Sequence, residues 1–322
     1  MTDAYSGGEV LVEVTRSELV ESRHHGSVTV LGPDGAPVDE AGDATGPVFP
    51  RSSNKPLQAV GMLRAGLQLA DPSEVALASG SHHGEPAHVT RVRAMLARAD
   101  LSEADLGCPA DYPLSEQARM ALIRAGGEPS PVLMNCSGKH AAMLLTCRAN
   151  GWPTGGYLDP SHPLQQAIAA TIAGLASEPI AAVGVDGCGA PVFAFSLRGL
   201  ATAFLRLVLA PPGTPERTVA DAMRAYPELV SGTGASAHDT RLMTGVPGLL
   251  AKGGAEGVAA VALPGTGAVA LKIDDGGARA RMPVLVSALS RLGVRAPVLD
   301  ELTAEGRVRG GGRTVGTIRV VW

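Results

Sequence analysis

Aromatic residues are scarce in this 322-residue chain, at 3%, and no run of basic residues interleaves with aromatic ones. The formal net charge is only −4 at pH 7. Surfaces that bind nucleic acid combine clustered lysine and arginine with aromatic platforms on which bases stack. The composition therefore argues against a nucleic-acid partner.

Long apolar segments are also missing. No stretch reaches the roughly 20 consecutive apolar residues that span a bilayer. The first residues, "MTDAYSGGE", lack the basic region followed by an apolar region that is typical of a secretory signal. We therefore expect no membrane association and a cytoplasmic location.

Four cysteines, Cys108, Cys136, Cys147 and Cys188, are too few to define a disulfide framework in a chain of this length. They could pair as two disulfides, but nothing marks the chain as secreted. We expect free thiols that serve packing, metal binding or chemistry.

Lysine is the rarest charged residue, with four lysines against twenty-three arginines. Unlike arginine, lysine can lose its proton and act as a base or metal ligand, or act as a compact point charge. Lys55, Lys139 and Lys252 lie in short stretches rich in Ser, Cys or Gly: "SSNK", "NCSGKH" and "AKGGAEG". Lys272, beside Asp274 and Asp275, fits a solvent-facing turn and receives no role.

The hydrophobic pattern predicts an α+β fold in which an antiparallel sheet is packed with helices. Alternating residues in 10–38, with a turn at 32–35, predict two strands, and residues 313–322 predict another. Residues 250–277 read as glycine-broken strands. Helices are expected over residues 57–65, 86–99, 115–125, 140–149 and 163–176. Pairing of the first and last strands would make residues 1–322 a single domain.

The pair Ser52-x-x-Lys55 allows two interpretations. In a helical turn, residues i and i+3 share a face, so a neutral lysine amine could remove the serine proton during nucleophilic attack. Alternatively, Ser53 or Asn54 caps the helix that begins at Pro56, and Lys55 is solvated. A proline at position 56 also disfavours the helical conformation at Lys55, which would place the pair in a turn.

Two further stretches carry candidate groups. In "SGSHHGEP", Ser81 could provide a second hydroxyl for proton relay, or the stretch could be a loop that caps the following helix. In "AKGGAEG", Lys252 could present its amine to a pocket at a strand end. The alternative is an edge-strand lysine that opposes aggregation.

Cysteines and neighbouring polar residues in "NCSGKHAAM" and "VDGCGAP" could form a soft metal site. Thiolate and imidazole ligands usually indicate zinc, and the general preference would select Cys136, His140 and Cys188. The spacing is not that of a zinc finger. A buried, reduced cysteine pair is the alternative.

Six motifs, in order along nearly the whole chain, resemble the thermolabile asparaginase II family, the rhizobial-type or class 3 L-asparaginases. They are "RSSNKPLQA", "SGSHHGEPAH", "NCSGKHAAML", "DGCGAP", "KGGAEGV" and "LKIDDGGARA". The resemblance implies a fold like that of serine β-lactamases and penicillin-binding proteins. It also implies hydrolysis of the L-asparagine side-chain amide to L-aspartate and ammonia through a serine acyl-enzyme.

The roles that this resemblance implies are specific. Ser52 is the nucleophile and Lys55 its base, while Ser81 and Lys252 form a second pair that relays protons and helps to expel ammonia. We expect the oxyanion donors to be backbone N–H groups of Ser52 and of a loop near Gly253 or Gly254.

The same resemblance implies a zinc site and a substrate site. The metal ligands become Cys136, Lys139 and Cys188, with zinc helping to position the substrate. His140 and Asp186 would face the substrate, and Arg51 would grip its α-carboxylate. The family also suggests a homodimer.

One stretch departs from the family pattern. Where Gly-x-Gly-Arg-x-Asp-Thr is expected, the chain has "SGTGASAHDTRLM", with Ala235 in place of the arginine. Two alternatives therefore remain: hydrolysis of another amide, such as glutamine or a β-lactam, or a zinc-containing protein that binds amino acids without turnover.

Overall fold

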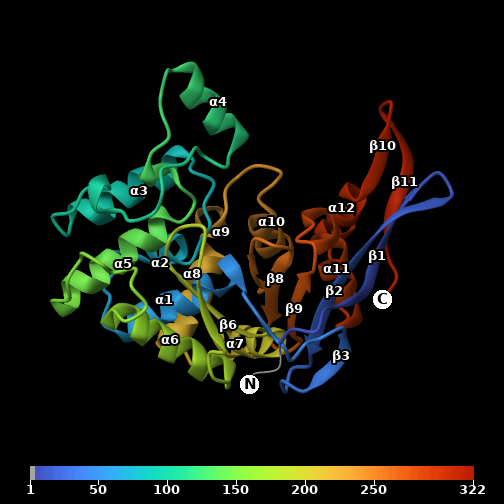
Figure 1. Cartoon of the computed structure of the whole chain (residues 1–322), viewed down its shortest axis with the longest axis horizontal. Coiled ribbons are helices and arrows are strands. Elements are labelled where there is room, and N and C mark those ends of the chain that lie inside the picture. The colour runs from blue at the N-terminus through green and yellow to red at the C-terminus, as the bar shows by residue number, and fades with distance from the viewer. Residues whose placement is uncertain (1–3) are drawn as a thin grey trace.

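The computed structural model describes residues 4–322, and an antiparallel sheet of eight strands forms one side of it (Figure 1). The strand order is β10-β11-β1-β2-β9-β8-β7, with β3 paired to β2. The strands are β1 (Glu9–Arg16), β2 (Leu19–Leu31), β3 (Pro37–Ala41), β7 (Leu250–Gly253), β8 (Val258–Leu263), β9 (Gly267–Ile273), β10 (Arg307–Gly310) and β11 (Arg313–Val320). A small sheet, β4-β6-β5, contains β4 (Pro47–Val48), β5 (Ala182–Val185) and β6 (Pro191–Ser196).

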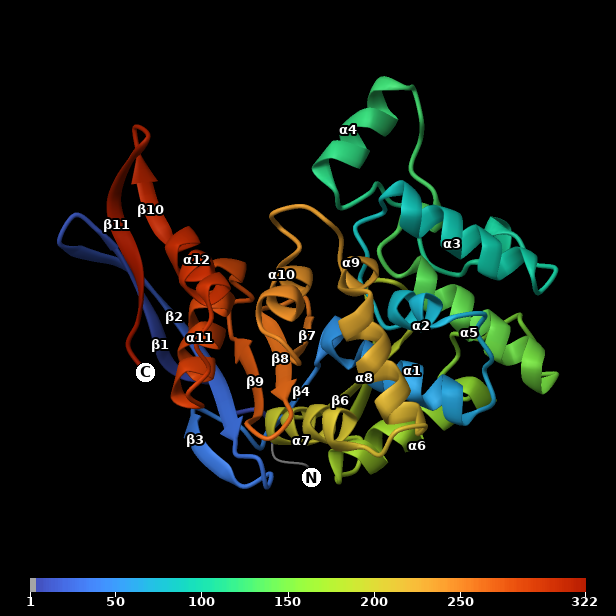
Figure 2. The same cartoon turned by 180° about the vertical axis from the view of Figure 1, so that it is seen from behind.

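Helices cover the sheet and build the other side of the molecule (Figures 1 and 2). They are α1 (Lys55–Arg64), α2 (Pro72–Ala78), α3 (Pro86–Ala97), α4 (Glu116–Arg124), α5 (Ser137–Asn150), α6 (Pro163–Ala176), α7 (Leu197–Leu209), α8 (Pro215–Ala225), α9 (Pro227–Val230), α10 (His238–Gly245), α11 (Ala278–Arg291) and α12 (Pro297–Glu305). Helix α7 packs on β2, β8 and β9, and α11 packs on β9 and β11. Helices α1, α2, α5, α6 and α8 pack on one another.

The two ends of the chain meet in one sheet, as the sequence predicts. Strand β1 pairs antiparallel with β11, and Val12 lies opposite Val320. The turn predicted at residues 32–35 is confirmed, because Gly32 N donates to Ala36 O at 2.8 Å. The α+β class is therefore confirmed. One continuous cluster of buried apolar side chains joins sheet and helices, while the division into domains stays a prediction.

All five predicted helices are confirmed within a few residues at each end. Among residues 4–322, no helix combines the length and apolar character needed to cross a bilayer.

The start of α1 corrects two expectations. Lys55 adopts the helical conformation, at φ −58° and ψ −38°, so the expected effect of the following proline is wrong. Pro56 fits because the first turn of a helix has no partner for its N–H groups. The capping alternative also fails: Asn54 makes no side-chain cap, Ser53 Oγ donates to Pro50 O at 2.6 Å, and Lys55 is 1% exposed. Ser52 itself lies in a 3-10 turn, Arg51–Asn54, just before α1.

The close packing of α1 on α6 depends on a glycine. A Cβ atom added at Gly61 would lie 3.0 Å from Ile168 Cα and 3.3 Å from Ile168 Cγ1. We expect Gly61→Ala to separate the helices and to lower the free energy of unfolding by about 1–3 kcal/mol. A matched control exists in α6, where nothing lies within 4 Å of a Cβ at Gly174. There the same change should raise stability by about 0.5–1 kcal/mol, through helix propensity. Urea unfolding of both variants checks this, and equal effects would contradict it.

Candidate active site

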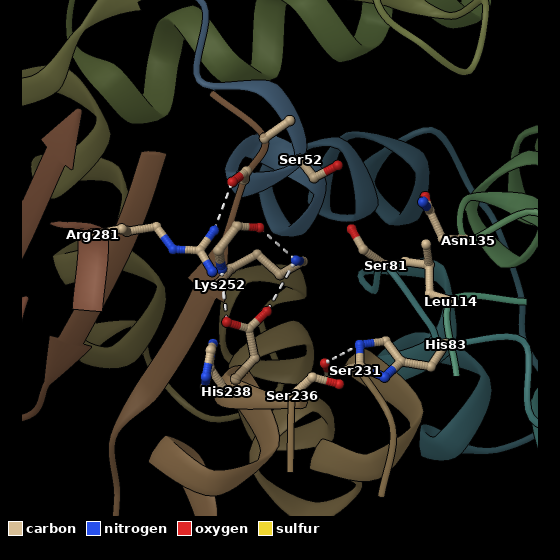
Figure 3. Close-up of a pocket in the computed structure, with 14 residues that line it drawn as sticks. Ser52, Ser81, His83, Leu114, Asn135, Ser231, Ser236, His238, Lys252 and Arg281 are labelled. Carbon is tan, nitrogen blue, oxygen red and sulfur yellow. Dashed lines mark hydrogen bonds and ion pairs between the residues drawn. The ribbon is translucent and has the colours of Figure 1, made fainter. Parts of the chain in front are cut away.

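A cavity of about 250 Å³ lies where the 3-10 turn before α1, the end of β7 and the start of α10 meet. Three predicted catalytic residues, Ser52, Ser81 and Lys252, line it. In Figure 3 their hydroxyl and amine groups point toward the same space. The other polar lining residues are His83, Asn135, Ser231, Ser236, His238, Asp239 and Arg281.

Lys55 lies behind this cavity and makes a full set of hydrogen bonds. Its Nζ donates to Gly80 O at 2.8 Å, to Ser81 Oγ at 2.9 Å and to Cys136 Sγ at 3.1 Å. Within residues 4–322 no hydrogen bond joins Lys55 to Ser52. The structure therefore brings Lys55 to Ser81, and the serine–lysine pairs differ from those that the sequence implied.

The predicted partner of Ser81, Lys252, is instead paired with Asp239. Lys252 Nζ donates to Asp239 Oδ2 at 3.0 Å and to Gly253 O at 2.6 Å, and the lysine is 2% exposed. Burial lowers the pKa of Lys252, and the charge of Lys55 lowers it further, whereas Asp239 opposes both effects. Burial alone would raise the pKa of Asp239, but the charges of Lys252 and Arg281 hold it below its usual value. Asp239 thus favours the charged form of Lys252, and the ion pair as a whole carries no net charge.

The three residues expected to bind substrate do not line this cavity. Arg51 Nε donates to Asp186 Oδ1 at 2.7 Å, and Arg51 also faces Glu256 at 3.6 Å. Arg51 has φ +51°, in the left-handed region that costs energy for a residue with a Cβ. His140 is completely buried, with its Nδ1 2.7 Å from Tyr157 Oη. Their substrate-binding roles stay predictions.

The predicted zinc ligands come together under the catalytic cavity. Cys136, Lys139 and Cys188 are buried, and Lys139 Nζ donates to Cys188 Sγ at 3.2 Å. A hydrogen bond from Cys136 and the charge of Lys139 lower the pKa of the Cys188 thiol far below its usual range, against the effect of burial. All four cysteines are free thiols, as expected.

This donor set fits a soft metal ion. Lys139 Nζ has Cys188 Sγ as its single hydrogen-bond partner in the described part of the chain, and the buried His140 Nε2 has none. No group of three or more His, Cys, Asp and Glu side chains that could hold a metal occurs within residues 4–322. A site here would therefore need the lysine amine as its third ligand.

The backbone at the end of β7 presses against the turn that carries Ser52. A Cβ atom at Gly254 would lie 2.8 Å from Pro50 O and 3.4 Å from Ser52 N, so only glycine fits. The N–H groups of Gly253 and Gly254 already donate to Asp239 Oδ1 and Val258 O. Both of these N–H groups are therefore engaged in this structure, and the expected oxyanion donors, from Ser52 and the loop near Gly253 or Gly254, stay a prediction.

Sequence reasoning missed two charged members of the cavity. Asp239 lies in "SGTGASAHDTRLM", a stretch that stands out only because it departs from the family pattern. Nothing in the residues around Arg281, "ARARMPV", marks that arginine as a site residue. Arg281 Nη1 donates to Gly254 O at 2.8 Å and lies next to the Asp239–Lys252 pair.

Two serine hydroxyls and two buried lysine amines thus lie in or next to one cavity, and they are the kinds of groups that serine–lysine hydrolases use. The profile of the L-asparaginase II family matches residues 12–320. The chain therefore belongs to the L-asparaginase II family, which confirms both the resemblance and the expected enzyme class, an amidohydrolase.

Comparisons with curated proteins and with solved structures give no match or weak ones. No curated protein matches the chain. Among solved structures, the native form of Mglu is 16% identical, with a TM-score of 0.43, and the match covers 83% of this chain and 63% of that one. A β-lactamase from Mycobacterium bovis is 15% identical, with a TM-score of 0.37, over 87% of this chain and 94% of that one. At these TM-scores the likeness carries no argument about this chain.

The Asp239–Lys252 pair predicts a pH-dependent stability. Asp239→Asn removes the charge that faces a buried ammonium group and should lower the free energy of unfolding by on the order of 3 kcal/mol at pH 7. Because the pKa of folded Asp239 lies below its unfolded value of about 3.9, its stabilisation is present above that value. It is lost as the pH falls through the folded pKa, so the difference from wild type should persist down to about pH 4 and shrink as the pH falls below the unfolded value.

Asp221→Asn is the matched control, because Asp221 pairs with Arg217 and Arg224 on the surface. Its effect should stay below about 1 kcal/mol. Urea unfolding at several pH values measures both variants. A pH-independent effect of Asp239→Asn would contradict the assignment of this pair.

Proposed function

We propose that this protein hydrolyses the side-chain amide of L-asparagine to L-aspartate and ammonia through an acyl-enzyme on Ser52. The observation that carries the proposal is the convergence of Ser52, Ser81 and Lys252 on one small cavity in a member of the L-asparaginase II family. Ser52 is the hydroxyl on the turn against which Gly254 packs, so its position is fixed by backbone contacts.

Proton movement follows the hydrogen bonds around Lys55. In the proposed first step Lys55 is a neutral amine, so the 2.9 Å contact between Ser81 Oγ and Lys55 Nζ runs from the hydroxyl to the amine. Ser52 Oγ attacks the amide carbon, and its proton passes by way of Ser81 Oγ to Lys55 Nζ. The same route returns the proton to the amide nitrogen, the C–N bond breaks, and ammonia leaves. Water then attacks the aspartyl ester and releases aspartate.

The cationic groups that line the cavity are the candidates for binding the negatively charged groups of the substrate. Lys252 and Arg281 lie on its β7 side, and both adjoin Asp239. We propose that they attract the substrate α-carboxylate and that Lys252 stabilises negative charge as the carbonyl oxygen becomes tetrahedral. The role expected for Arg51 would require it to release Asp186, with which it is paired.

We propose that Cys136, Lys139 and Cys188 hold zinc. Burial, two thiols and a lysine amine with one partner support this assignment. When bound, the metal would act as a Lewis acid that helps to position polar groups of the substrate. Lys55 Nζ connects this cluster to Ser81 through its bond to Cys136 Sγ.

The nucleophile is tested by Ser52→Ala. Ammonia release from L-asparagine should fall by at least about 10⁴-fold, because the proposed mechanism places the acyl group on Ser52 and assigns Ser81 to proton transfer, while circular dichroism and thermal unfolding stay unchanged. Ser290→Ala in α11 makes the same change away from the cavity and should keep full activity. Parallel assays with L-glutamine and nitrocefin separate the substrate classes. Activity retained in Ser52→Ala would refute the mechanism.

The metal site is tested by Cys188→Ala. Wild-type protein purified with zinc in the medium should contain about one zinc per chain, and the variant should lose most of it, since thiolates dominate zinc affinity. Cys147→Ala is the control, because Cys147 is also a buried free thiol but belongs to no proposed ligand set. Elemental analysis of the purified proteins measures both. Zinc retained by Cys188→Ala, or lost equally from both, would contradict the site.

A further inference from the structure

A second cavity adjoins the catalytic one. Its volume is about 610 Å³, against about 250 Å³ for the catalytic cavity, and the two share His83 and Ser236 as lining residues. The N-terminal part of α4 and the loop of residues 233–236 form its other walls. Figures 1 and 2 show α4 projecting above the loop that joins α9 and α10.

The shared wall is held in place by backbone bonds. Ser81 N donates to Val230 O at 2.8 Å, and His83 N donates to Ser231 O at 2.6 Å. The imidazole of His83 is fixed in turn, with Nε2 3.2 Å from Ser231 Oγ. On the far side of the second cavity the loop presents small residues, Gly234 and Ala235, so no side chain closes the space.

The proposed mechanism places the leaving group next to Ser81, close to the residues that the two cavities share. In the proposed mechanism Ser81 returns the proton to the amide nitrogen, and His83, two residues further along the same clamped segment, lines both cavities. A substituent on that nitrogen would therefore extend past His83 into the second cavity. If ammonia were the only leaving group, no part of the substrate would occupy the second cavity.

The charges of the two cavities have opposite signs. Two cations, Lys252 and Arg281, line the catalytic cavity with one carboxylate, Asp239, whereas the second cavity is lined by two carboxylates, Glu85 and Glu116. Glu85 is held in place by the backbone N–H of Thr233 at 3.0 Å and by its hydroxyl at 3.2 Å. Burial lowers the pKa of His83, so the shared residue adds no positive charge near pH 7. The second cavity therefore favours a cationic group over an anionic one.

We propose that this site also cleaves N-substituted side-chain amides of asparagine, with the amine leaving group in the second cavity and a preference for leaving groups that carry a further positive charge. The inference rests on the proposed function. The amide C–N bond breaks, the aspartyl group passes to Ser52 Oγ, and the serine proton goes to the departing amine nitrogen. Water then releases aspartate, so the balance is that of amide hydrolysis.

Two substrates of similar size, whose substituents carry opposite charges, test the proposal. The first is N4-(2-aminoethyl)-L-asparagine, which releases a diamine, and the second is N4-(carboxymethyl)-L-asparagine, which releases glycine. Aspartate formation by wild-type protein should be at least about tenfold more efficient, as kcat/KM, for the first than for the second. L-Asparagine is assayed in parallel to report on the proposed function itself.

The variant Ala235→Trp fills the second cavity from the loop without altering a residue that lines the catalytic one. It should lower kcat/KM for the aminoethyl substrate by at least about tenfold and leave that for L-asparagine within about twofold. Ala36→Trp, in the exposed turn between β2 and β3, is the control and should change neither value.

The outcomes separate the two claims. Hydrolysis of L-asparagine with no cleavage of either substituted amide would overturn the inference and leave the proposed function standing. Failure on all three substrates would overturn both. Equal loss of both activities in Ala235→Trp, or a preference for the carboxymethyl substrate, would also contradict the second cavity as the site of the leaving group.

Discussion

The burial of three lysine amines, one lining the catalytic cavity and two in the hydrogen-bonded clusters next to it, is the constraint on which the site depends. Lys55, Lys139 and Lys252 are each at most 2% exposed, and an unpaired ammonium group at such a depth is strongly unfavourable. Each lysine accordingly contacts polar partners of its own. These are Ser81 and Cys136 for Lys55, Cys188 for Lys139, and Asp239 for Lys252. These partners bring the helical side of the molecule, the small cysteine-bearing loops and the main sheet to one place.

The three lysines have different hydrogen-bond partners, and the partners of each suit a different chemical role. A carboxylate favours the charged form of Lys252, whereas Lys55 contacts a carbonyl, a hydroxyl and a thiol, of which the hydroxyl and the thiol can pass on a proton. Lys139 faces thiols, which suits a ligand role. One residue type thus has three proposed tasks, and an arginine-rich chain has kept lysine where a guanidinium group could not serve.

Much of the secondary structure and several site residues could be predicted from the sequence, because hydrophobic periodicity and the residues that begin and end helices and turns are local features. The terminal strands, the hairpin turn and five helices followed from alternation, glycine and proline, and the candidate side chains Ser52, Ser81 and Lys252 stood in short polar motifs. The sequence could not predict which side chains contact one another in the site. Lys55 meets Ser81 across 26 positions, and Arg281 reaches Gly254 from α11, so these contacts depend on the packing of whole elements. The homodimer and the cytoplasmic location stay predictions.

The central claim is that Ser52 carries the aspartyl group during turnover. Acid quenching of the protein during steady-state hydrolysis of L-asparagine, followed by peptide mapping with mass spectrometry, tests it most directly. The account predicts an aspartyl adduct on the peptide that contains Ser52, located to that hydroxyl by fragmentation and absent from Ser52→Ala. An adduct on Ser81 or on another residue would contradict it.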